Sequence, residues 1–320
     1  MDRRGFVVGT AALALAPRAL ARALAATPTA LVTADEEARL VAVDLATGRV
    51  RSYVRTRPKP RSIEAVGDVA VVAHSELGAI TIVDGASFGV RHALGGLGEP
   101  RYTAAHPDGR HAYVSDAERG EVVVLDVLRG RIVGRERVGP RARHIGLHPN
   151  ARRLWVALGR KAERIAVVDV RVRSRPRLLG TIRPPFLAHD VGFAPDGGRV
   201  WVSSGDQDEL AVYDARNVRL LARVRGDAPP QHVTFQGGRV YVTSGDSGTL
   251  RVHRVGGRLL RTTRVPTGSY NVQQAQGWVV TPGLGRGSLC ILDAQGRLVR
   301  REQIARSSHD ACIVAGRSSM

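Results

Sequence analysis

The stretch that decides the fold runs from residue 187 to residue 224 and reads LAHDVGFAPDGGRVWVSSGDQDELAVYDARNVRLLARV. It contains four short apolar segments, separated by polar or glycine-containing turns such as APDG and SSGD. Asp-Gly turns accept the positive φ of tight hairpins, and short runs rich in β-branched and aromatic residues favour strands. The stretch therefore predicts four consecutive antiparallel strands.

The same pattern recurs along the chain as a motif of apolar, any, apolar, apolar, Asp. Its seven copies end at Asp44, Asp84, Asp126, Asp169, Asp214, Arg254 and Asp293. The spacings are 40, 42, 43, 45, 40 and 39 residues, which is the period of a four-stranded propeller blade. We expect the Asp residues to accept hydrogen bonds from turn backbones. The sequence predicts an all-β, seven-bladed β-propeller with four antiparallel strands in each blade.

The two ends of the repeat array predict how the ring closes. The first repeat begins at the second strand of a blade, and the segment HDACIVAG at 309–316 provides an innermost strand that no later repeat uses. We expect this strand to pair with the amino-terminal segment, because closure removes exposed sheet edges. Residues 27–320 are then one propeller domain, and we expect a monomer.

Residues 1–26 have the layout of a secretory signal. The segment has a charged start, an apolar stretch from Phe6 to Ala16 and small residues before residue 27. The apolar part is too short to anchor the chain in a bilayer. The run RRGFV at 3–7 resembles the twin-arginine export motif. We expect export by the twin-arginine route to the periplasm, the cell envelope or the outside, with no transmembrane anchor after cleavage.

The composition favours anionic partners. The chain has 48 Lys and Arg against 29 Asp and Glu, a formal net charge of +19, and such a field attracts anions. The arginines do not alternate with aromatic residues as stacking platforms require, which argues against a nucleic-acid partner. Two cysteines make neither a disulfide framework nor a metal cluster. We expect Cys290 and Cys312 to be buried thiols, with a single bridge as the alternative.

Two longer segments resemble known propeller families. YVTSGDSGTLRVHRVGGRLLRTTRV at 241–265 and AYVSDAERGEVVVLDVLRGRIVGRERVG at 112–139 resemble the YVTN repeats of YncE-like seven-bladed propellers. GPRARHIGLHPNARRLWVALG at 139–159 is similar to a repeat of the lactonase-type seven-bladed propellers. The resemblance covers essentially the whole mature chain and implies the same fold. Members of these families serve as binding proteins, cell-surface proteins and occasional enzymes, so it implies no single function.

Two adjacent columns of residues stand at the starts of the innermost strands. The first column reads Arg61, Arg101, Arg143, His189, Gln231, Tyr270, His309. The second column reads Ser62, Tyr102, His144, Asp190, His232, Asn271, Asp310. Innermost strands surround the channel of a propeller and start at one mouth, so we expect these polar groups to converge on a site. A merely solvated polar ring is the alternative. Which column faces the channel stays open, because alternate strand residues face opposite sides.

Three kinds of chemistry are compatible with these columns. A copper or zinc ion would use the imidazoles of His144, His189, His232 and His309, together with Asp190 or Asp310. A small anion would use Arg61, Arg101 and Arg143, whose guanidinium groups bind carboxylate or phosphate in bidentate pairs. A hydrolase or lyase would use His189 or His309 as a base beside a carboxylate, with Arg143 as the polarising cation.

We therefore predict an exported binding or interaction protein whose ligand lies at the channel mouth, with a lactonase-like hydrolase or lyase as the alternative. The partner is a small anion, a metal ion or a component of the cell envelope. The predicted ligand-binding residues are Arg61, Arg101, Arg143, His144, His189, Asp190, His232, His309 and Asp310. His106 and His148 lie in turns of the HPDG type, where we expect a structural role only.

Overall fold

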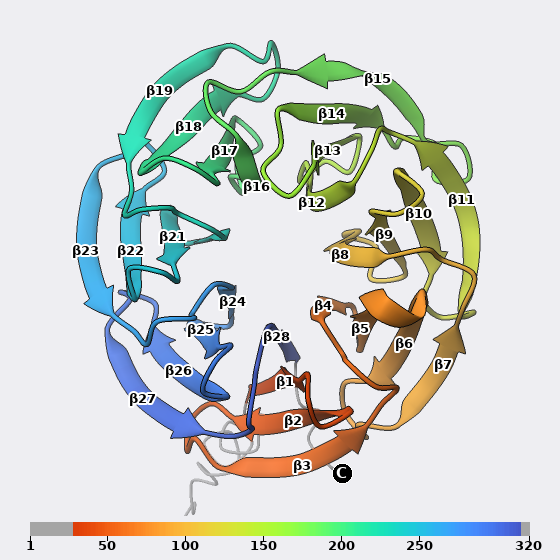
Figure 1. The fold of residues 1–320 in the computed structure, drawn as a ribbon, viewed down its shortest axis with the longest axis vertical. Coiled ribbons are helices and arrows are strands. Elements are labelled where there is room, and N and C mark those ends of the chain that lie inside the picture. Colours follow the sequence, from red (N-terminus) through yellow and green to blue (C-terminus); the bar gives the residue numbers. More distant parts are fainter. Residues whose placement is uncertain (1–27, 315–320) are drawn as a thin grey trace, which may run out of the picture.

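The computed structural model describes residues 28–314, which form seven four-stranded antiparallel sheets around a central channel (Figure 1). Each sheet is one blade, and its first strand is the one nearest the channel. The blades are blade 1 (β28, Ala311–Val314; β1, Thr29–Ala34; β2, Arg39–Asp44; β3, Val50–Arg55), blade 2 (β4, Ser62–Val66; β5, Val69–His74; β6, Ala79–Asp84; β7, Val90–Leu94) and blade 3 (β8, Pro100–Ala105; β9, His111–Asp116; β10, Glu121–Asp126; β11, Arg131–Arg137). A 3-10 turn, η1 (Ser75–Leu77), follows β5.

The remaining four blades repeat this order. They are blade 4 (β12, Ala142–Leu147; β13, Arg153–Leu158; β14, Arg164–Asp169; β15, Arg177–Ile182), blade 5 (β16, Ala188–Phe193; β17, Arg199–Ser204; β18, Glu209–Asp214; β19, Leu220–Arg225), blade 6 (β20, Val233–Gln236; β21, Arg239–Ser244; β22, Thr249–Arg254; β23, Leu259–Arg264) and blade 7 (β24, Gln273–Ala275; β25, Trp278–Gly283; β26, Ser288–Asp293; β27, Leu298–Gln303). The predicted seven-bladed, all-β propeller is confirmed.

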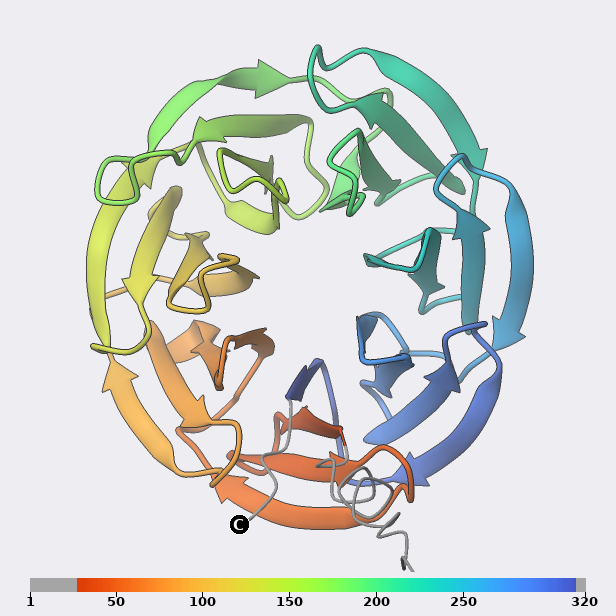
Figure 2. The same cartoon turned by 180° about the vertical axis from the view of Figure 1, so that it is seen from behind.

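Blade 1 closes the ring with strands from both ends of the described chain. β28 pairs antiparallel with β1, with Leu31 opposite Cys312 and Val32 opposite Ala311. Both views place β28 beside β1 on the channel side of the blade (Figures 1 and 2). The predicted pairing of the carboxy-terminal strand with the amino-terminal segment is confirmed, and blade 1 has four strands like the other six blades.

The hydrophobic core lies between the blades. Seven clusters of buried side chains fill the seven interfaces between neighbouring blades. At the interface of blades 2 and 3, for example, Val71 and Ile82 pack in one cluster with Val114 and Val123. The middle strands of each blade are buried on both faces for this reason, whereas the outer strands, such as β27, are exposed. Cys290 and Cys312 are buried free thiols, as predicted.

The repeated Asp residues stabilise the turns that follow the third strands. The Oδ1 atom of Asp214 accepts hydrogen bonds from the backbone N–H groups of Arg216 and Asn217, at 2.8 and 3.2 Å. Asp84 accepts from two turn amides in the same way. The turn histidines are also structural: Nδ1 of His106 lies 3.1 Å from the N–H of Asp108. The prediction that the Asp residues accept from turn backbones is confirmed, and His106 makes a turn contact of its own.

The inner strands of blades 3, 4 and 5 each carry a β-bulge at the two polar columns. On β8, Pro100 and Thr103 are opposite Asp116 and Val114 of β9, so the inner strand has one extra residue. The bulged pairs are Arg101 and Tyr102 on β8, Arg143 and His144 on β12, and His189 and Asp190 on β16. A bulge breaks the strict alternation of side chains between the faces of a strand and re-aims them. Both columns can therefore face the channel.

The predicted signal segment, residues 1–26, lies outside the described residues. Between residues 28 and 314, the structure contains no helix that is long and apolar enough to cross a membrane.

Candidate functional site

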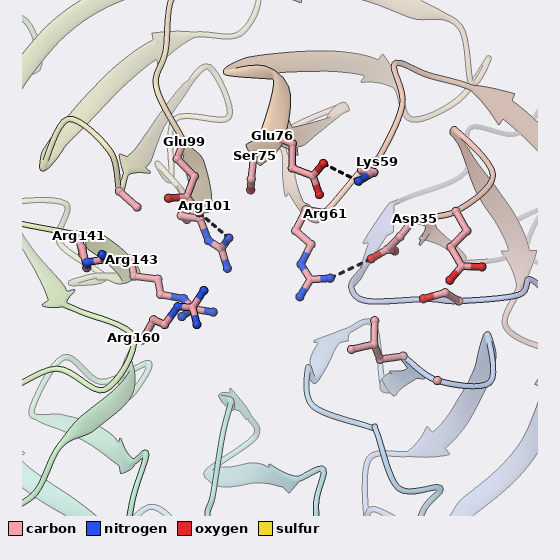
Figure 3. Close-up of a pocket in the computed structure, with 15 residues that line it drawn as sticks. Asp35, Lys59, Arg61, Ser75, Glu76, Glu99, Arg101, Arg141, Arg143 and Arg160 are labelled. Atoms are coloured by element: carbon pink, nitrogen blue, oxygen red, sulfur yellow. Dashed lines mark hydrogen bonds and ion pairs between the residues drawn. The ribbon is translucent and has the colours of Figure 1, made fainter.

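A cavity of about 950 Å³ opens at one mouth of the channel, where arginines from consecutive blades meet. Arg61 precedes β4, Arg101 lies on β8 and Arg143 lies on β12. Figure 3 shows the guanidinium groups of these three residues pointing into the same space. The wall is completed by Asp35, Glu36, Lys59, Ser75, Glu76, Glu99, Ala117, Arg141, Arg160, Leu284, Gly285 and Ser307. The predicted convergence of the three arginines is thus present in the structure.

Three of the cations in this cavity are paired with acids from neighbouring segments. Nζ of Lys59 lies 2.5 Å from Glu76, and the guanidinium groups of Arg61 and Arg101 lie 3.3 and 2.9 Å from Asp35 and Glu99 (Figure 3). Burial raises the pKa of Asp35 to about 6, although Arg61 opposes that shift.

The other three cations in the wall have no such partner. Within residues 28–314, no carboxylate forms an ion pair with Arg141, Arg143 or Arg160, and Nε of Arg143 is buried without a hydrogen-bond partner. Burial lowers the pKa of Arg143, the positive charges of Arg101 and Arg160 lower it further, and Tyr102 opposes the shift. The blade 4 side of the cavity therefore holds uncompensated positive charge.

Hydroxyl groups of neighbouring blades hold the backbone of the first column in place. Oγ of Ser115, on β9, donates a hydrogen bond to the carbonyl oxygen of Arg143 in the next blade. Ser203 donates in the same way to the carbonyl oxygen of Gln231, and Thr243 to that of Tyr270. The backbones of Arg143, Gln231 and Tyr270 are thus each held by a hydroxyl group of the preceding blade.

Three of the four predicted histidines come together deeper in the channel. His144 of β12, His189 of β16 and His232, just before β20, each offer a ring nitrogen, and these nitrogens all lie within 4.8 Å of one another. The ring of Tyr102 stacks on that of His144, with 4.1 Å between the ring centroids. We call His144, His189 and His232 the histidine cluster.

The fourth predicted histidine, His309, is held apart from this cluster. Its Nδ1 lies 2.9 Å from the carbonyl oxygen of Arg61 and 3.2 Å from Nδ2 of Asn271. Burial lowers the pKa of His309 well below its usual range, and Arg61 adds to that shift. His309 is therefore a neutral side chain that bridges the start of blade 2 and the start of blade 7.

The two second-column aspartates, Asp190 and Asp310, link adjacent blades. The carboxylate of Asp190 accepts hydrogen bonds from its neighbour Val191, at 2.8 Å, and from the N–H of Val233 in the next blade, at 3.0 Å. Asp310 repeats this arrangement with Ala311 at 2.8 Å and Ile63 at 3.1 Å. Both side chains line a second cavity of about 310 Å³ inside the channel, together with Tyr102 and His232.

The predicted pairing of a histidine base with a carboxylate falls on a different residue. Among the described residues, no carboxylate is hydrogen-bonded to the ring of His189 or His309. Instead, Nδ1 of His232 lies 3.3 Å from Oδ2 of Asp190. His189 and Asp190 are neighbours in the sequence, but the bulge on β16 sends their side chains to different partners.

Sequence reasoning missed several residues of the site. Lys59, Arg141 and Arg160 lie in loops outside the two columns, so the alignment of inner strands gave no signal for them. Tyr102 was in the second column but had no predicted role. Glu64, two residues after Ser62 on β4, lines the second cavity. Burial raises the pKa of Glu64 to about 7, although a hydrogen bond from Gln273 at 2.9 Å opposes that shift.

Comparison with known proteins supports the fold. No protein-family model matches the chain, and no curated protein matches it. Among solved structures, it is similar to hydrazine synthase of Kuenenia stuttgartiensis, with a TM-score of 0.72 and 14% identity over 83% of this chain and 92% of that chain. It is also similar to a functionally unknown protein from Desulfotomaculum acetoxidans, with a TM-score of 0.78 and 13% identity over 90% of this chain and 99% of that chain. At these identities the likeness shows the fold alone.

Proposed function

We propose that this protein is an exported binding protein of the YVTN type that holds a small anion in the arginine-lined cavity at the channel mouth. The carrying observation is the uncompensated charge of Arg141, Arg143 and Arg160, which have no carboxylate partner among the described residues. Like charges brought together repel unless an anion lies between them. The twin-arginine-like residues 1–26 and the YVTN-like repeats support the export and the family of this proposal.

The geometry suits a carboxylate or a phosphate. Guanidinium groups donate paired hydrogen bonds to both, and the net charge of the chain steers anions towards the protein. Arg61 and Arg101 already have carboxylate partners, Asp35 and Glu99, which keep their side chains at the cavity edge.

Binding is favoured over catalysis by the surroundings of the predicted bases. His189 and His309 have no carboxylate hydrogen-bonded to their rings in residues 28–314, and the channel histidine that does lie beside a carboxylate, His232 with Asp190, is not one of the two predicted bases. The proposal therefore gives these histidines no proton-transfer role.

Isothermal titration of the mature, metal-free protein with inorganic phosphate and with succinate tests this proposal. We expect Arg143→Gln to weaken binding at least tenfold, because it removes one charged hydrogen-bond donor worth about 1.5–3 kcal/mol. The matched control is Arg261→Gln on the exposed strand β23, which changes the net charge equally.

The Arg261→Gln control distinguishes binding at the cavity from attraction of the anion by the net charge of the protein. Equal weakening by Arg143→Gln and Arg261→Gln would mean that the anion responds only to net charge. Absence of binding to either anion would contradict the proposal and would favour a larger cell-envelope component as the partner.

A further inference from the structure

The histidine cluster lies inside the channel, next to the second cavity and below the arginines of the mouth. We propose that His144, His189 and His232 bind a transition metal ion of the copper(II) or zinc(II) class. The proposal does not depend on anion binding at the mouth, because it uses different side chains from blades 4, 5 and 6.

The spacing of the three rings suits one ion. Their centroids lie 4.2 Å apart for His144 and His189, 4.8 Å for His144 and His232, and 5.5 Å for His189 and His232. A tetrahedral zinc ion with bonds of about 2.1 Å holds its nitrogen ligands about 3.4 Å apart. The ligand nitrogens here are within 4.8 Å of one another, so small ring rotations bring all three into the first coordination shell.

His144 gives an observation that is independent of this spacing. The side chain is 1% exposed, and neither Nδ1 nor Nε2 has a hydrogen-bond partner among the described residues. Leaving a buried donor or acceptor unpaired costs about 1–3 kcal/mol. Native proteins rarely accept this cost without a functional reason. A metal ion bound to one ring nitrogen removes part of it and explains why the imidazole is there.

Burial and neighbouring charges act on two rings of the cluster. A metal binds the neutral imidazole, and burial lowers the pKa of His144 and of His189 well below the usual range. The mutual repulsion of the cluster's rings, if charged, acts in the same direction.

The third ligand has a carboxylate behind it. Nδ1 of His232 lies 3.3 Å from Oδ2 of Asp190, and Asp190 is itself fixed by the N–H groups of Val191 and Val233. In metal sites, a carboxylate of this kind orients the ring and leaves its other nitrogen for the ion. Asp190 is thus a positioning residue. Tyr102 covers the face of His144 and limits access of water from that side.

Three nitrogen ligands leave at least one coordination position for water or another ligand. An all-nitrogen set favours copper(II) and zinc(II) over magnesium or calcium, which prefer oxygen ligands. His309 is outside the set, because its Nδ1 contacts the carbonyl oxygen of Arg61.

The test is titration of the mature protein, without a polyhistidine tag and stripped by a chelator, with zinc(II), copper(II) and the spectroscopic probe cobalt(II). We expect one ion per chain and cobalt(II) absorption bands typical of nitrogen ligands. His144→Ala and His189→Ala should each weaken zinc or copper binding at least 100-fold. The matched control is His253→Ala, because His253 is also buried and has an unpartnered Nε2, but has no second histidine beside it to share an ion.

His189 decides the outcome if His144→Ala does not fold, because its side chain is only partly buried and circular dichroism can verify the fold of the variant. Asp190→Asn should weaken binding less than removal of a ligand does. Absence of stoichiometric binding to the wild-type protein would overturn the proposal. So would a folded His189→Ala variant that binds as tightly as the wild type, which would leave the cluster as a stack of aromatic rings.

Discussion

Asp190 makes two different contacts, one that links blades and one with the histidine cluster. Its carboxylate joins blade 5 to blade 6 through the N–H of Val233, and it also lies beside the ring of His232. Asp310 joins blade 1 to blade 2 in the same way through Ile63. Asp310 therefore has the role of linking two blades, whereas Asp190 links two blades and also contacts the histidine cluster through His232.

Glu64 predicts a pH dependence of stability. Burial raises its pKa from 4.5 to about 7 in the folded protein, so the unfolded chain ionises first as the pH rises. The unfolding free energy of the wild type, relative to Glu64→Gln, is then highest below pH 4.5. It should fall by roughly 3 kcal/mol between pH 4.5 and pH 7 and level off just above pH 7. Denaturant unfolding of both proteins between pH 4 and pH 8 measures this difference.

The control for Glu64→Gln is Glu118→Gln, which removes an exposed carboxyl group. A difference from the wild type that does not change with pH would show that Glu64 keeps an ordinary pKa in the folded protein.

At this scale, the residue types predicted much of the site. The Arg and His residues at the strand starts do converge, because a propeller brings equivalent strand ends to one mouth. The pairing of particular side chains was not predictable. His232 contacts Asp190, and His309 contacts a backbone carbonyl oxygen, because these contacts depend on bulge geometry and on rotamers that periodicity does not encode. Loop residues such as Arg160 had no repeated position to reveal them.

At the scale of the element, the bulges on β8, β12 and β16 decide what the channel contains. Each puts one extra residue into an inner strand, so that two successive side chains can both point inward. The sequence predicted the strands and their order from apolar periodicity, which is strong in the buried middle strands. It did not predict the bulges, because they fall on the polar columns where no apolar period fixes the register.

Gly146 on β12 lies where β12 and β16 pack closely against each other. A Cβ atom at this position would lie 2.5 Å from the carbonyl oxygen of Val191 on β16. We expect Gly146→Ala to force blades 4 and 5 apart and to lower the unfolding free energy by about 1–3 kcal/mol, the usual cost of overpacking. Because β12 and β16 carry His144 and His189, metal affinity should fall as well.

The control is Gly180→Ala on β15, where a Cβ atom would meet nothing within 4 Å. Denaturant unfolding and zinc titration measure both variants. Equal stability of the two variants would mean that the inner strands adjust without cost.

At the scale of the whole molecule, the ring depends on β28. This strand completes blade 1 by pairing with β1, and its side chains reach the clusters on both sides of that blade. The closure was predictable because the repeat count leaves one inner strand unused. No sequence motif near β28 identifies its partner strand. The partner follows from the requirement that the ring closes without an exposed sheet edge.

A variant that ends at Ser308 lacks β28 and should not close. Blade 1 would have three strands and an unpaired β1 edge, so we expect a lower unfolding temperature and concentration-dependent association in size-exclusion chromatography. Addition of a synthetic peptide of residues 309–320 should restore the stability and the monomer, because an extended peptide can add to a free sheet edge. A truncated protein that is as stable as the full chain in the absence of the peptide would contradict this role for β28.

The hydroxyl groups that hold the first-column carbonyl oxygens have a consequence for how this protein can diverge. Ser115, Ser203 and Thr243 each donate to a backbone carbonyl oxygen of the next blade, so the residue whose carbonyl they hold can change identity without loss of that contact. Mutation can therefore exchange Arg143, which lines the cavity at the mouth, while the hydroxyl of Ser115 still holds the backbone at that position. Descendants of such a protein would inherit one scaffold and acquire different ligands, at positions where selection for folding acts least.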